Sequence, residues 1–170
     1  MKSYLERMRF MQNLKRNFKI FGISILIPLV VGGLSALLTR NGMDIYSDVK
    51  MPPLSPPPWL FPVVWGILYV LMGVSSGLVW KLQSRNQQKA ANGLLFYVGS
   101  LILNFFWSII FFNLRWFLFA FLWLAVLWFL IIRTILDYRY VSPLAAGLQI
   151  PYLLWVTFAG YLNFAVWLIN

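Results

Sequence analysis

The sequence predicts an all-α integral membrane protein, a bundle of five transmembrane helices. Hydrophobic residues make up 61% of the 170 residues and charged residues only 11%, whereas an average soluble chain carries about 25% charged residues. Apolar runs of roughly twenty residues recur along the chain, which is the length that a helix needs to cross about 30 Å of hydrocarbon. These runs leave no room for a separate soluble domain.

The Lys and Arg residues distinguish the two sides of this predicted domain. Six of them precede the first apolar run, three lie in the last turn of the second or after it and two lie near the end of the fourth or after it, against three on the opposite side. By the positive-inside rule this pattern predicts a cytoplasmic N-terminus, and five spans then place the C-terminus on the other face. Membrane topology accounts for the formal net charge of +10, so nucleic acid is not an expected partner.

The N-terminal part of the chain divides into a basic segment and a first span. Residues 1–19 carry apolar side chains in steps of three and four, which predicts an amphipathic helix on the anionic inner leaflet. A disordered basic tail is the alternative. The first span is predicted at 20–39, where it contains Pro28, and Gly32 with Ala36 forms a small-xxx-small face suited to close helix packing.

A proline-rich connection leads into the second span. Residues 40–58 form the longest connection and hold five prolines within seven residues, which predicts a stiff, extended segment. We predict that this loop forms a lid over a pocket. The second span, 59–82, contains Gly73 and Gly77 as a GxxxG pair, which we expect to pack within the monomer.

Three further spans complete the predicted bundle, at 91–112, 117–136 and 144–169. The connections between them are short polar turns. The fourth span is nearly all apolar, so we expect its face to contact lipid or a partner subunit rather than a polar site.

Several kinds of chemistry are excluded by composition. Cys and His are absent, which excludes disulfides, thiol catalysis, zinc sites of the usual kind and histidine-ligated haem. The acidic residues all fall outside the predicted spans: Glu6, Asp44, Asp48 and Asp137. This distribution argues against a proton pump built on intramembrane acids and against acid–base hydrolysis within the membrane. We expect no metal site and no required cofactor.

Polar residues inside the spans are the candidates for a binding site, because polar groups in a bilayer need a partner or a function. Asn104 and Ser108 share one face of the third span, and Trp65 and Tyr69 share one face of the second. A further set in steps of three and four lies in the fifth span: Tyr152, Trp155, Ala159 and Asn163. Together these faces could line an aromatic cavity with a few amide and hydroxyl groups, as small-molecule sites do. An interhelical hydrogen bond is the alternative role for the two asparagines.

Three motifs carry a resemblance to a known family: PPLSPPPW leading into VWGILYVLMG and LVWK, then LNFFWSIIFF, then IPYLLWVTFAGYLNFAVWLIN. In this order and spacing they resemble the translocator protein family (TspO/MBR), whose bacterial members are called tryptophan-rich sensory proteins. The resemblance covers roughly residues 44–170. It implies a TspO-like five-helix bundle, commonly a homodimer, that binds protoporphyrin IX or haem between helices beneath the first loop. Relatives also bind benzodiazepine-receptor-class ligands, and some bind cholesterol.

Motif matches and helix faces together give the predicted ligand-binding set: Tyr46, Trp65, Tyr69, Asn104, Trp107, Ser108, Tyr152, Trp155 and Ala159. Two departures from the family pattern matter. Leu54 stands where the family usually has tryptophan in the loop. No Lys or Arg follows Arg139, so recognition of cholesterol through the basic motif of sterol-binding relatives is not supported.

The resemblance implies a membrane receptor or sensor for tetrapyrroles that acts in stress regulation. One alternative is an enzyme for light-dependent porphyrin degradation, with Trp65 and Trp155 as photo-redox partners and the reactive chemistry supplied by the porphyrin. A transporter of porphyrin or another amphipathic molecule is a second alternative, and a scaffold protein without a ligand is a third. The expected location is a bacterial plasma membrane, with the mitochondrial outer membrane as the alternative.

Overall fold

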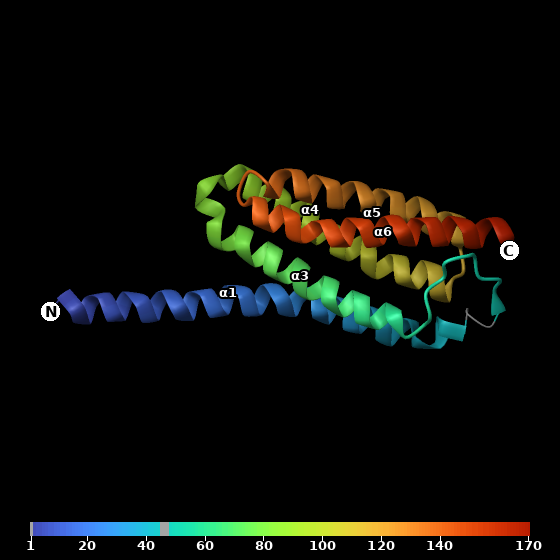
Figure 1. Ribbon diagram of the computed structural model, residues 1–170, viewed down its shortest axis with the longest axis horizontal. Helices are drawn as coiled ribbons and strands as arrows, with labels where there is room; N and C mark the ends of the chain where they lie inside the picture. The colour runs from blue at the N-terminus through green and yellow to red at the C-terminus, as the bar shows by residue number, and fades with distance from the viewer. Residues whose placement is uncertain (1, 45–47) are drawn as a thin grey trace.

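The computed structural model describes residues 2–44 and 48–170, and that part of the chain forms five long helices without a strand. The helices are α1 (Lys2–Thr39), α3 (Leu60–Leu82), α4 (Gln87–Ser108), α5 (Phe117–Tyr138) and α6 (Pro143–Ile169). Each lies in a stretch that is long and apolar enough to cross a membrane. The protein is therefore an integral membrane protein built as a five-helix bundle, as the sequence predicts (Figure 1).

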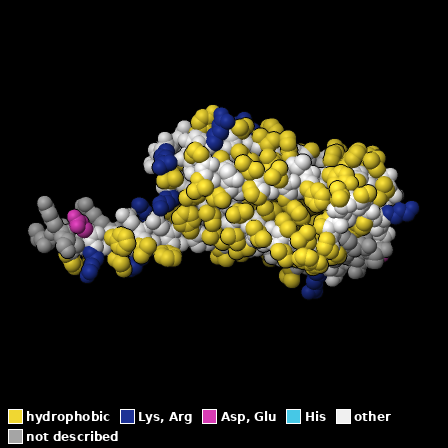
Figure 2. Space-filling view, viewed as in Figure 1, with side chains coloured by type: hydrophobic (Ala, Val, Ile, Leu, Met, Phe, Trp, Pro, Cys, Tyr) yellow, Lys and Arg dark blue, Asp and Glu magenta, His cyan; other side chains and the backbone are white. Residues whose placement is uncertain are grey.

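The helices follow one another around the bundle in the order α1, α3, α6, α5 and α4, and α4 contacts α1 again. One end of the bundle, here called the N-terminal end, carries the connections 83–86 and 139–142; the other, the loop end, carries residues 48–59, the turn at 114–116 and Asn170 (Figure 1). Hydrophobic side chains cover the face between these ends, whereas Lys and Arg gather toward the ends and along the projecting part of α1 (Figure 2).

Helix α1 is continuous from Lys2 to Thr39, so residues 2–19 are not a separate element from the predicted first span. Pro28 lies inside the helix without ending it. At 1.5 Å per residue, its 38 residues extend about 57 Å, far beyond the ~30 Å of a hydrocarbon core. The N-terminal part of α1 consequently projects past the bundle (Figure 1), with Phe10 and Phe18 largely exposed.

Small residues bring α1 and α3 into close contact. A Cβ atom at Gly73 would lie 2.5 Å from the Cα of Ile25, and one at Gly77 would lie 2.8 Å from Cδ1 of Phe21. These separations leave space for no side chain, so the GxxxG pair packs within the monomer, as predicted. Closer to the loop end, the Tyr69 ring occupies the position that a Cβ at Gly32 would take.

Capping explains where two of the helices begin. The side chain of Asn86 accepts a hydrogen bond from the backbone N–H of Lys89 at 3.1 Å, which extends α4 back to Gln87 from the predicted residue 91. Ser142 caps α6 in the same way through the N–H of Ala145, at 3.3 Å, ahead of a proline in the first turn.

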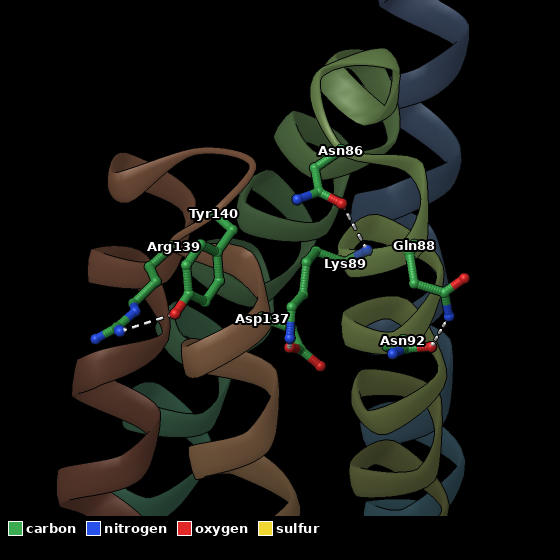
Figure 3. A network of polar contacts seen from close by, with 7 residues as sticks. All are labelled: Asn86, Gln88, Lys89, Asn92, Asp137, Arg139 and Tyr140. Atoms are coloured by element: carbon green, nitrogen blue, oxygen red, sulfur yellow. Dashed lines mark hydrogen bonds and ion pairs between the residues drawn. The ribbon is translucent and has the colours of Figure 1, made fainter.

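A polar network holds α4 against α5 at the N-terminal end (Figure 3). Lys89 Nζ lies 2.8 Å from Oδ1 of Asp137, whose side chain is only 2% exposed. Arg139 donates a hydrogen bond to the hydroxyl of Tyr140 at 3.1 Å, and this bond and the guanidinium charge lower the pKa of Tyr140. Arg85 donates to the carbonyl of Val141 at 3.4 Å. The cations nearest the connection between α5 and α6 are thus already bound.

Candidate ligand-binding cavity

A cavity of about 290 Å³ opens between α1, α3 and α4 near the loop end, and we call it the main cavity. Its lining combines aromatic rings with small and polar side chains: Gly32, Ser35, Ala36, Thr39, Arg40, Phe61, Pro62, Trp65, Tyr69, Trp107, Ser108 and Phe112. Four of the predicted ligand-binding residues therefore line one and the same space: Trp65, Tyr69, Trp107 and Ser108.

Aromatic pairs define the faces of the main cavity. The rings of Trp65 and Tyr69 stack with their centroids 5.4 Å apart and their planes at 27°. Trp65 also meets Tyr152 of α6 edge-on at 6.1 Å. Trp107 stacks on Phe111 at 5.5 Å and meets Phe112 edge-on at 6.1 Å. Because these pairs hold the rings in fixed orientations, the cavity presents preformed flat apolar surfaces.

Hydrogen bonds from α4 fix the tyrosine and tryptophan of these walls. Asn104 Nδ2 donates to the hydroxyl of Tyr69 at 3.0 Å. Trp107 Nε1 donates to Oδ1 of Asn163 at 3.2 Å, and Asn163 Nδ2 donates to the carbonyl of Phe117 at 2.7 Å. Both asparagines are about 1% exposed. Each asparagine therefore forms an interhelical hydrogen bond, and in doing so sets the orientation of a cavity wall.

Helix α1 supplies the polar side of the main cavity. Thr39 Oγ1 donates to the backbone carbonyl of Ser35 at 2.9 Å. The buried Ser35 hydroxyl has no hydrogen-bond partner in the described part of the chain, so it can donate to a ligand. Arg40 stands at the outer edge, where α1 gives way to the 3₁₀ turn η1 (Arg40–Asp44). A ligand in the main cavity would thus meet a hydroxyl and a guanidinium on one side.

A second, much smaller cavity of about 40 Å³ lies between α4, α6 and the proline-rich loop. Ala159 and Asn163 of α6 line it, with Met51 and Ser55 of the loop opposite. Three aromatic residues line both this small cavity and the main cavity: Phe61, Trp107 and Phe112. These three side chains therefore lie between the two cavities.

Polar contacts pin the loop over the small cavity. Lys50 and Asn170 exchange two hydrogen bonds, from Lys50 N to Asn170 Oδ1 at 2.9 Å and from Asn170 Nδ2 to Lys50 O at 3.1 Å. The Tyr161 hydroxyl donates to the carbonyl of Pro53 at 3.1 Å, and Arg115 pairs with Asp48 at 2.8 Å. Residues 48–58 of the predicted lid are therefore fixed to α6 and to the turn after α4.

Leu54 lies at the tip of that loop and points away from the cavities. Its φ of +68° and the bond from Ser55 N to the Pro52 carbonyl at 3.3 Å give a tight turn with Pro53 and Leu54 at its centre. The side chain is 79% exposed. Leu54 consequently makes no contribution to the cavity walls.

The end of α4 widens into a π-helical turn, η3 (Ile109–Asn113). The N–H of Leu114 bonds to the carbonyl of Ile109 at 3.1 Å, five residues back. The extra residue lets the adjacent Phe111 and Phe112 both reach Trp107 from different sides. Such turns are frequent at functional sites, and here one builds the wall between the two cavities.

A comparison with protein-family models matches the TspO/MBR family over residues 24–168. The chain belongs to the TspO/MBR family. It is 37% identical to the translocator protein of Bos taurus over 143 residues, covering 84% of this chain and 85% of the relative. It is 39% identical over 151 residues to the protein CrtK of Rhodobacter capsulatus, covering 89% and 92%. A tryptophan-rich sensory protein of Cereibacter sphaeroides is 31% identical over 125 residues, covering 74% and 76%.

Membership in the TspO/MBR family, with relatives named as translocator and sensory proteins, supports a role as a membrane receptor or sensor. The match begins at residue 24, so the projecting part of α1 lies outside it.

The predicted site residues separate into three groups in the structure. Trp65, Tyr69, Trp107 and Ser108 line the main cavity, Ala159 lines the small cavity, and Asn104 and Tyr152 support the walls from behind. Trp155 does not line the main cavity and instead meets Phe61 edge-on at 5.8 Å. Tyr46 lies outside the described residues.

The prediction missed the contribution of α1 and of the phenylalanines. Ser35 and Thr39, one helical turn apart near the end of an apolar run, were a signal for a polar inward face. Phe61 and Phe112 carried no signal, because they resemble the other apolar residues of their spans.

Proposed function

We propose that this TspO/MBR protein is a membrane receptor or sensor that binds a tetrapyrrole, protoporphyrin IX or haem, in the main cavity. The observation that carries the proposal is the set of oriented rings of Trp65, Tyr69 and Trp107 around about 290 Å³ of space. A flat conjugated macrocycle gains from stacking on such faces. The volume lies just below the ~300–1,000 Å³ typical of ligand sites.

The polar side of the main cavity supports a ligand that carries carboxylates, as porphyrins of this class do. Arg40 can form two parallel hydrogen bonds to a carboxylate, and the Ser35 hydroxyl has a free donor in the described part of the chain. Rotation of Phe61 and Phe112 would add the small cavity to the binding space. Because the chain contains no histidine, haem would bind through ring contacts rather than through histidine ligation.

We propose that the protein lies in a bacterial plasma membrane with a cytoplasmic N-terminus and acts there in stress regulation. The excess of Lys and Arg at the N-terminal end favours this orientation. The mitochondrial outer membrane is the alternative location. The homodimer that the resemblance implies stays a prediction.

Light-dependent porphyrin degradation is the second candidate, favoured by the position of Trp65 on the wall of the main cavity. In this scheme a photoexcited porphyrin takes one electron from the Trp65 indole, giving an indole cation radical and a porphyrin anion radical. Dioxygen, the external oxidant, then adds across a methine carbon–carbon bond of the porphyrin anion radical, and the extra electron returns to the indole cation radical. Cleavage of the resulting dioxetane breaks that carbon–carbon bond and leaves two carbonyl groups, so the macrocycle is opened and Trp65 is regenerated. Trp155 would take part only through Phe61, whose ring it contacts.

A titration of the detergent-purified protein with protoporphyrin IX, followed by tryptophan quenching in the dark, tests the proposal. We expect saturable quenching for wild type and a loss of affinity of about tenfold in Trp65→Phe, because one stacking face is reduced. Trp128→Phe is the matched control, since Trp128 bonds to Thr157 on the outer face of α5 and α6.

Illumination of the same complexes separates the two candidates. A new porphyrin product in wild type, lost in Trp65→Phe at saturating porphyrin, would favour degradation, whereas binding without turnover would favour the receptor. An absence of saturable binding in wild type would refute both.

A further inference from the structure

A further hollow, separate from the two cavities near the loop end, lies at the N-terminal end between α1 and the end of α3. Its volume is about 520 Å³. Three cations line it together with aromatic, apolar and amide or hydroxyl side chains: Arg16, Lys19, Ile20, Trp80, Lys81, Gln83 and Ser84. No acidic side chain belongs to this lining.

The packing of the two helices creates the hollow. Gly73 and Gly77 hold α3 tightly against α1 in the middle of the bundle. Beyond Leu82 the chain turns away through the 3₁₀ turn η2 (Gln83–Arg85), while α1 continues past the bundle (Figure 1). The space between the departing chain and the continuing helix is therefore open to an external molecule.

The three cations have no ion-pair or hydrogen-bond partner among the described residues, in contrast to their neighbours. At the same end, Lys89 pairs with Asp137 and Arg139 bonds to Tyr140 (Figure 3). Arg85 bonds to the backbone carbonyl of Val141. The positive-inside rule accounts for the number of cations at this end. It does not account for the convergence of three unpaired ones from two helices on a single hollow.

The depth of the hollow matches the headgroup layer of a bilayer. Lys19 is the last residue before the apolar run that begins at Ile20, and Lys81 lies one residue before the end of α3. Trp80, which is 38% exposed, is the kind of residue that favours the boundary between hydrocarbon and headgroups. An occupant of the hollow would have its charged part at the level of lipid phosphates.

We propose that this hollow is a binding site for a phosphate-bearing anion, namely the headgroup of an anionic phospholipid from the surrounding leaflet. Arg16, Lys19 and Lys81 bind the phosphate, and Gln83 with Ser84 can bond to hydroxyls of the headgroup. Ile20 and Trp80 pack against the glycerol and the first carbons of the acyl chains. Since the lining contains no carboxylate, the cationic amine of a zwitterionic lipid finds no partner, and the site selects a net negative headgroup.

Parallel titrations with two lipids test this proposal, and their result does not depend on the function of the main cavity. Delipidated protein in mild detergent is titrated with phosphatidylglycerol or phosphatidylcholine of identical acyl chains, and bound lipid is counted by native mass spectrometry. We compare wild type with Arg16→Gln/Lys81→Gln. The control, Arg7→Gln/Lys15→Gln, removes one Arg and one Lys from the projecting part of α1, outside the hollow.

We expect wild type and the control to bind phosphatidylglycerol in preference to phosphatidylcholine. The Arg16→Gln/Lys81→Gln protein should lose about thirtyfold in affinity for phosphatidylglycerol, because each cation near anionic lipid contributes roughly a factor of five. Its unchanged thermal midpoint without lipid would show that the fold is intact.

Two outcomes would overturn the proposal. Equal losses in both double variants would mean that net charge, and not the hollow, attracts the lipid. If inorganic phosphate raised the thermal midpoint of wild type as much as phosphatidylglycerol does, the site would be assigned to a soluble anion.

Discussion

Asn104 of α4 and Tyr69 of α3 are joined by a buried hydrogen bond of 3.0 Å at the inner end of the main cavity. The same tyrosine ring stacks under Trp65 and lies against Gly32 of α1. One side chain therefore connects three helices and sets the position of a cavity wall. Substitutions around it should change stability and porphyrin binding together.

Tyr69→Phe should lower the free energy of unfolding by about 1–2 kcal/mol, because the buried amide of Asn104 loses its acceptor. The measurement is unfolding in mixed detergent micelles. Tyr138→Phe is the matched control, since the Tyr138 hydroxyl is buried without a partner among the described residues, and its removal should cost nothing or stabilise the protein. Equal effects of the two changes would contradict a role for the Asn104 bond.

Gly32→Ala should destabilise the protein by about 1–3 kcal/mol and weaken porphyrin binding, because the new methyl group overlaps a Tyr69 ring held on its other sides. Gly33→Ala should be neutral or stabilise the helix by up to about 1 kcal/mol, since a Cβ there would meet no heavy atom of the other described residues within 4 Å, apart from its own stretch of helix. Thermal midpoints and quenching titrations of both variants check this. A Gly32→Ala protein with wild-type affinity would show that the Tyr69 wall is adaptable.

Asn163→Ala should cost about 1–2 kcal/mol and reduce the affinity for protoporphyrin IX, because Trp107 loses the acceptor that orients its indole. Tryptophan fluorescence should also shift as the indole changes environment. Asn92→Ala is the control, since its side chain bonds to Gln88 at the surface. A loss of stability without a loss of affinity for protoporphyrin IX would show that the orientation of Trp107 does not contribute to binding.

Lys89→Met should destabilise the protein by about 2 kcal/mol, because it removes the cation that pairs with the nearly buried Asp137 carboxylate. Adding Asp137→Leu should restore most of that loss, since the unpaired charge is then removed. Lys15→Met on the exposed part of α1 is the control. Denaturation of wild type, the two single variants and the double variant gives the coupling energy, and additive effects of the two substitutions would contradict a direct interaction.

The length of the apolar runs was enough to locate the five helices along the chain, because the length of such a run reflects the thickness of the bilayer. It could not place the start of α4, where Asn86 caps three polar residues that hydropathy excludes. It also divided α1 at residue 19, because a change in composition marks the membrane boundary and not the end of a helix.

The sequence identified the site residues that are unusual within a membrane span and missed those that are common there. Asn104 and Trp107 are both conspicuous; Trp107 lines the main cavity and Asn104 bonds to its Tyr69 wall. Trp155 is equally conspicuous, yet it contacts Phe61 rather than the main cavity, since helix rotation is set by packing that one sequence does not specify. The π-helical turn at Ile109–Asn113 depends on the same packing.

The two hydrogen bonds between Lys50 and Asn170 couple the position of the proline-rich loop to the end of α6. Any movement of residues 48–58 away from α6 must break the two hydrogen bonds between Lys50 and the Asn170 side chain. A spin label or fluorophore near residue 170, paired with one on α5, would then convert occupancy of the interior into a distance. A bulky fusion at the same place would disturb these two hydrogen bonds and leave the loop unattached to α6.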